Sequence, residues 1–151
     1  MILLVACGDP VPDKSPLEKA RQLHSDDQYE QALTVLREAM RAEPEDPEAR
    51  LLLAEVYLDL EQGDLARTAI EQAIDRGLAP HRASLPMGRA LFLQRRWSDL
   101  LDVEVPSELG VAERTMLLYL QAEARAALPG SIGGLDDTVV RAYIELFAVT
   151  E

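Results

Sequence analysis

The stretch LLLAEVYLDLEQGDLARTAIEQAI, residues 51–74, decides the fold of this chain. Most of its residues are Ala, Leu, Glu, Arg and Gln, which are strong helix formers. Gln62-Gly63-Asp64 interrupts them with residues that break helices and favour a turn. The stretch therefore predicts two helices joined by a short turn.

The same pattern returns at a distance of about 34 residues on either side of this stretch. Small residues recur where two helices would cross closely, and large apolar residues recur where they would fill the gap. A pair of helices is therefore predicted to repeat along the chain. The aligned sets are Leu17, Leu51 and Leu85; Ala20, Ala54 and Gly88; Leu23, Tyr57 and Leu91; Ala32, Ala66 and Leu100; Leu36 and Ile70; and Ala39 and Ala73.

Turn-forming residues divide the rest of the chain at even intervals into helices of about 10–20 residues. The first helix is expected to start after Ser15, which caps it, with Pro16 in its first turn and Glu18 three residues after the cap. The residues before it are typical of a linker. The fold is predicted to be all-α, with one domain over 15–151. Its repeats are expected at about 15–46, 47–80, 81–106 and 107–151.

The composition limits the classes of function that are possible. The chain has 151 residues, the size of one domain, and only 5% of them are aromatic, which favours a core of Leu, Ala, Val and Ile. The formal net charge of -12 at pH 7 would repel a phosphate backbone, so no nucleic-acid partner is expected. A negative charge of this size is typical of a solvated helical surface. The alternative interpretation is that it serves to bind a basic partner.

The sequence lacks the residue patterns of catalysis and of metal binding. Its two histidines, His24 near a helix end and His81 in a predicted loop, have no second His or Cys at ligand spacing. No serine lies in a nucleophile elbow, and no glycine-rich loop precedes a lysine. The acidic pairs Asp26-Asp27 and Asp136-Asp137 are adjacent, so they suit helix caps better than acid/base catalysis. We therefore expect no enzyme activity, no metal and no cofactor.

The repeat resembles the tetratricopeptide repeat, a helix-turn-helix unit of about 34 residues. The likeness covers residues 15 to about 104. It implies a right-handed superhelix of antiparallel helix pairs, an α-solenoid with about four repeats of which the last is divergent. It also implies a non-enzymatic scaffold for protein–protein interactions. The residues that fit the signature are Leu53-Ala54 with Tyr57 in a first helix; Ala32, Leu36, Ala39 and Pro44 in a second helix and after it; and Tyr29 and Trp97 at the aromatic position that opens the second helix.

The fourth repeat departs from this pattern. Residues 97–104 are expected to form a shortened second helix ended by Pro106, residues 108–128 a long helix, and residues 135–149 its partner. That last helix is more apolar than a terminal one should be, because the end repeats of solenoids need a polar outer face. We therefore expect the natural chain to continue, or another subunit to cover this end.

Repeats of this family line a concave groove with their first helices, and the groove holds an extended or helical peptide. The resemblance therefore implies a peptide-binding groove, and the alternative is that half of these residues are core between repeats. Chaperone C-termini are not expected as ligands, because family members that clamp them use Lys, Asn and Arg, whereas this sequence has no Asn and only Lys14 and Lys19. The expected groove residues are Leu17, Arg21 and His24; Glu48, Leu51, Glu55 and Leu58; Arg82, Leu85, Arg89, Phe92 and Leu93; and Tyr119 and Glu123.

The first ten residues, MILLVACGDP, hold the only cysteine of the chain, Cys7. Leu4-Val5-Ala6-Cys7 resembles the bacterial lipobox, in which a small residue precedes a cysteine that becomes diacylated. The resemblance implies a lipid anchor in the bacterial envelope, facing the periplasm and in the outer rather than the inner membrane. A signal peptide has a basic start and a longer apolar run, so residues 1–14 are expected to be a truncated lipoprotein signal followed by a linker.

The lipobox cysteine, the linker and the repeats over residues 17–77 together resemble the N-terminal part of tetratricopeptide lipoproteins of the exosortase (PEP-CTERM) system. RLLLA at Arg50–Ala54 and WSDLL at Trp97–Leu101 are part of this likeness. It implies a role in exopolysaccharide export or surface-protein sorting. Two alternatives remain open: a cytosolic tetratricopeptide adaptor whose first residues are an ordinary terminus, and a repeat appendage of a longer protein with an enzymatic region elsewhere.

Overall fold

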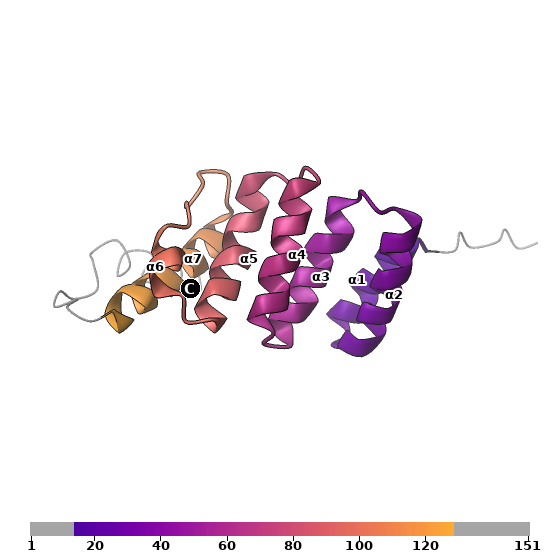
Figure 1. Ribbon diagram of the computed structural model, residues 1–151, viewed down its shortest axis with the longest axis horizontal. Helices are drawn as coiled ribbons and strands as arrows, with labels where there is room; N and C mark the ends of the chain where they lie inside the picture. The colour runs from indigo at the N-terminus through magenta and orange to yellow at the C-terminus, as the bar shows by residue number, and fades with distance from the viewer. Residues whose placement is uncertain (1–13, 129–151) are drawn as a thin grey trace, which may run out of the picture.

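The computed structural model describes residues 14–128, and all regular secondary structure in that range is helical. This confirms the predicted all-α fold. The helix pairs follow one another along a row, from α1 and α2 at one end to α6 and α7 at the other (Figure 1). They are α1 (Pro16–Ser25), α2 (Tyr29–Ala42), α3 (Pro47–Asp59), α4 (Gly63–Asp75), α5 (Pro80–Leu93), α6 (Trp97–Leu101) and α7 (Val111–Ala127).

The turn between the two helices of a pair is repeated three times with the same geometry. The first helices end at residues 25, 59 and 93, and the second helices begin at residues 29, 63 and 97, so both boundaries recur at one constant interval. Each turn holds one residue with a left-handed backbone, with φ values of 57°, 57° and 55° at Asp27, Glu61 and Arg95. The next backbone N–H then donates to a carbonyl five residues earlier, which closes the end of the first helix. These bonds are Gln28 to Leu23 at 2.8 Å, Gln62 to Tyr57 at 2.8 Å and Arg96 to Leu91 at 2.9 Å.

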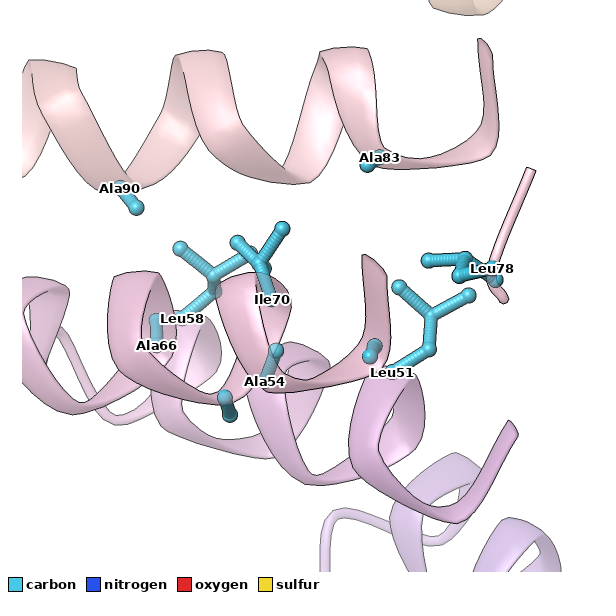
Figure 2. Packing of buried hydrophobic residues seen from close by; sticks show 10 residues of the cluster. Leu51, Ala54, Leu58, Ala66, Ile70, Leu78, Ala83 and Ala90 are labelled. Atoms are coloured by element: carbon cyan, nitrogen blue, oxygen red, sulfur yellow. The ribbon is translucent and has the colours of Figure 1, made fainter. Parts of the chain in front are cut away.

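Small side chains let the two helices of each pair approach closely. Ala54 and Ala66, on α3 and α4, are both fully buried, and they lie with Leu58 and Ile70 in one apolar cluster (Figure 2). The matching positions of the neighbouring repeats are also buried: Ala20 and Gly88 match Ala54, and Ala32 and Leu100 match Ala66. The alignment of the repeats is thus visible in the packing.

The pairs stack so that their cores merge. The first helices α1, α3, α5 and α7 contact one another in order, while α2 and α4 each pack between their own first helix and the next one. Three apolar clusters follow one another, the first between α1, α2 and α3, the second between α3, α4 and α5, and the third between α5, α6 and α7. Leu53 packs against both the first and the second cluster, and Met87 packs against both the second and the third. Residues 14–128 therefore share one continuous apolar interior.

The helix ends follow the predicted local signals in α1 and depart from them in α7. The Glu18 backbone N–H donates to the Ser15 hydroxyl at 3.2 Å, and the Ser15 N–H donates to the Glu18 carboxylate at 3.0 Å, which confirms the predicted cap. Helix α7 begins at Val111 and not at residue 108, because Gly110 is its cap and donates its N–H to Glu113. Cys7 and the predicted helix over 135–149 lie outside the described residues.

Replacing Gly63 by alanine should destabilise the fold by about 1–3 kcal/mol, the usual cost of overpacking. A Cβ at this position would lie 2.9 Å from Leu93 Cβ and 3.0 Å from the Ala90 carbonyl oxygen, and neither atom can move without shifting α5. Gly110→Ala is the control, because its Cβ would meet only the end of the Glu113 side chain, at 3.4 Å. It should cost about 0.5 kcal/mol through the weaker cap. Urea unfolding measures both, and equal losses would show that the close α4–α5 contact is not what Gly63 serves.

Candidate functional site

Four first helices line a hollow of ≈ 260 Å³, which we call the inner hollow. Its floor and walls combine apolar and charged side chains, and α3 and α5 supply most of them. Six of the predicted groove residues meet here: His24, Leu51, Glu55, Arg82, Leu85 and Arg89. Five further residues complete the lining: Asp59, His81, Pro86, Leu109 and Glu113.

At one edge of the inner hollow, Glu48 of α3 joins α1 to α5. Its carboxylate accepts a hydrogen bond from Arg21 at 3.1 Å and two from Arg82, one of them at 3.0 Å. The bond from Arg82 first, and then that from Arg21, holds the pKa of Glu48 below its usual value despite the opposing effect of burial. Three helices that are not neighbours in sequence are thus linked through one carboxylate.

At the other edge, Asp59 makes the same kind of bridge at the opposite end of α3. His24 Nε2 lies 2.7 Å from one Asp59 oxygen, and Arg89 donates to the other at 2.9 Å. Burial is the largest single influence on the pKa of Asp59 and would raise it, but the bonds from His24 and Arg89 outweigh burial and lower it. The charged form of Asp59 is therefore stabilised by its two partners.

Glu55 lies on the same face of α3, seven residues after Glu48 and four before Asp59, so its carboxylate is between the two bridges. Within residues 14–128 it forms no hydrogen bond and no ion pair. Burial raises the pKa of Glu55, and the nearby charges of His24 and Arg21 reduce that rise without cancelling it. The site therefore holds one half-buried carboxylate that no neighbour in the described chain satisfies.

Two shallower hollows continue from the inner one towards the ends of α5 and α7. The first, of ≈ 390 Å³, includes Leu58, Phe92 and Leu93 of the predicted groove in its lining. The second, of ≈ 400 Å³, adds Glu123 and is lined by Trp97, whose ring meets that of Phe92 edge to face at a centroid distance of 5.4 Å. Leu93 is 39% exposed, so an apolar surface is open at this end.

The predicted groove residues do not all reach an open surface. Leu51, in the inner hollow, and Leu58, in the first shallower hollow, are only 6% and 3% exposed, so they belong mainly to the core, as the alternative interpretation expected for part of the set. Leu17 packs against the cluster around Leu36. Arg21 and Glu48 adjoin the inner hollow through their ion pairs, and Tyr119 is exposed on α7.

The role of Asp59 was not predicted from the sequence, and the predicted loop position of His81 is wrong. Asp59 follows Glu55 by four residues, and residues four apart lie on the same face of a helix. This spacing was sufficient to predict that Asp59 lies on the groove face. His81 is not in a loop but in the first turn of α5, because Pro80 is well suited to the first position of a helix.

The described residues offer few other kinds of site. Between residues 14 and 128, no group of three or more His, Cys, Asp or Glu side chains could hold a metal ion. In the same range, no helix has both the length and the apolar character needed to cross a membrane.

Glu55→Gln should stabilise the protein at pH 7, by about 0.5–1 kcal/mol. The pKa of Glu55 is raised on folding, so its charged form costs stability above the pKa of the unfolded state, about 4.3. The gain should therefore shrink as the pH falls to 4. Glu48→Gln is the matched control on the same helix and should destabilise at pH 7 by about 0.5–1 kcal/mol, because its solvent-accessible ion pairs are worth little more. Urea unfolding at both pH values measures these changes, and a loss of stability in Glu55→Gln would contradict the assignment of an unsatisfied carboxylate.

Comparisons with known proteins agree with this architecture. Residues 23–85 match the family model described as a tetratricopeptide repeat. No curated protein matches the sequence significantly. A solved structure described as "First TPR of Spaghetti (RPAP3) bound to HSP90 peptide SRMEEVD" has a TM-score of 0.52 at 15% sequence identity, over 91% of this chain and 98% of that one. Residues 23–85 are therefore similar to tetratricopeptide repeats, and the described part of the chain has the fold of a tetratricopeptide α-solenoid.

Proposed function

We propose that this protein is a non-enzymatic scaffold that binds a segment of a partner protein along its first helices. The observation that carries the proposal is the inner hollow, because four helices from successive repeats converge on it with an apolar floor and a charged rim. Tetratricopeptide repeats are interaction modules, and the similar solved structure is described as holding a bound peptide.

The ligand of that solved structure is not the one we propose for this chain. Neither Lys14 nor Lys19 lines the inner hollow, and the sequence has no Asn, so a clamp of Lys, Asn and Arg around a terminal carboxylate cannot be built here. The cations that do line it, Arg82 and Arg89, are already held by Glu48 and Asp59. We therefore propose recognition of an internal segment of the partner.

The groove proposal is tested by affinity capture from envelope extract with the full chain as bait. Arg89→Glu and Phe92→Ala should each reduce the captured partner about ten-fold, since removing a central anchor commonly costs about 1.4 kcal/mol or more. Arg37→Glu makes the same charge change at an exposed position of α2 and should leave capture unchanged. Thermal melts of all three variants show whether the fold is intact. Equal capture by every folded variant would remove the groove from the proposal.

We further propose that Cys7 is diacylated and anchors the scaffold in the bacterial envelope, facing the periplasm, with the outer membrane favoured. The support is in the sequence: Leu4-Val5-Ala6-Cys7 matches a lipobox, Cys7 is the only cysteine, and a linker separates it from α1. Two acyl chains give stable anchoring, whereas one gives marginal binding. The likeness to exosortase-system lipoproteins supports a role in exopolysaccharide export or surface-protein sorting.

Membrane fractionation of the full-length gene product, made from its natural start codon, tests the anchor. The wild type should sediment with the membranes, and Cys7→Ser should move to the soluble fraction, because no acyl chain can be attached. If the wild type itself is soluble and cytosolic, the anchor is refuted and the protein is a cytosolic adaptor.

A further inference from the structure

We propose, resting on the scaffold function above, that the inner hollow receives a basic side chain, lysine or arginine, of the bound segment and pairs its charge with Glu55. The proposal names the chemical class of the partner at one position. It follows from how the charged residues of α1, α3 and α5 are matched around the hollow.

Three carboxylates lie along one face of α3, and the outer two are each held by basic side chains from both neighbouring first helices. Glu48 has Arg21 and Arg82, while Asp59 has His24 and Arg89. These two bridges leave Arg82 and Arg89 committed to partners on either side of the middle position. Glu55, in that middle position, forms no ion pair or hydrogen bond with any side chain of residues 14–128.

The wall opposite Glu55 explains why no residue of α5 completes the pattern. Between Arg82 and Arg89, α5 lines the hollow with Leu85 and Pro86, which are apolar. Lysine and arginine place an apolar stem against such surfaces and carry their charge at the tip. A basic side chain inserted here would contact Leu85 and Pro86 along its stem and reach Glu55 with its charged end.

The space and the remaining charges suit such a guest. The hollow has a volume of ≈ 260 Å³, several times the roughly 30 Å³ that one water occupies in the liquid, so a long side chain fits. Of the other charged or titratable groups in the lining, His81 is at the start of α5 and Glu113, on α7, accepts a hydrogen bond from Gly110. The net charge of -12 also attracts a basic segment over a distance.

The energetic state of Glu55 supports the same guest. Burial raises its pKa, so its negative charge is held at a cost in the free protein. A cation brought into contact would favour the charged form and lower that pKa. A neutral or acidic guest would add to the cost instead, which is why a basic side chain is the occupant we infer.

The experiment uses a phage library of random twelve-residue peptides selected on the full chain. Enriched peptides should share a lysine or arginine at one position. For one such peptide and its analogue with norleucine in place of the basic residue, we expect about ten-fold weaker binding of the analogue to the wild type and less than two-fold weaker binding to Glu55→Gln. Glu113→Gln is the control, because it changes the other carboxylate of the hollow that has no ion pair in the described chain. This variant should still bind the peptide about ten-fold more tightly than the norleucine analogue.

The possible failures are distinguishable. Peptides that bind the wild type, fail to bind Phe92→Ala and show no preference for a basic residue would overturn this inference and leave the scaffold function standing. A ten-fold difference that persists in Glu55→Gln would overturn the assignment to Glu55. If no peptide is enriched on the wild type over Arg89→Glu, the scaffold function fails, and this inference fails with it.

Discussion

The structure depends on how closely the two helices of a repeat can approach. Ala54 and Ala66 are fully buried on facing helices, and a larger side chain at either position would force α3 and α4 apart. On α5, Gly88 stands in the place of Ala54, and a Cβ there would lie 2.5 Å from Leu117 Cδ1 of α7, so at this position the small residue makes room for the next first helix. Because small residues recur at the repeat period, neighbouring helices can pack closely and the pairs can stack.

The fixed packing face of each first helix decides what its opposite face presents. With Ala54 turned towards α4, the helical period turns Glu48, Glu55 and Asp59 of α3 towards the inner hollow. Arg82 and Arg89 are separated by two helical turns on α5, so each meets one of the outer carboxylates. The ion pairs are therefore a consequence of the core packing, and they in turn join first helices that the chain does not place next to each other.

The fold could be predicted from short-range signals in the sequence, whereas the site depends on contacts between helices that are far apart in the sequence. The helix pairs, the cap at Ser15 and the buried columns were predictable, because helix formers, turn residues and small residues act over a few positions. The sequence could place Glu48 and Arg82 on the groove face, but their ion pair requires the spacing between α3 and α5. The depth of Leu51, which is 6% exposed, depends on how far Leu85 and α5 cover it, and no residue pattern gives that value.

Glu55 is the one place on this face of α3 where the charge matching fails. Glu48 is paired with two arginines, and Asp59 is paired with a histidine and an arginine. The carboxylate of Glu55 lies between them and has no such partner in the described chain. Residues that lower the stability of the fold and have no structural role are typical of functional positions. An arriving cation would gain the interaction that the free protein lacks, and the specificity of the hollow would then come from the same charge that weakens the fold when the hollow is empty.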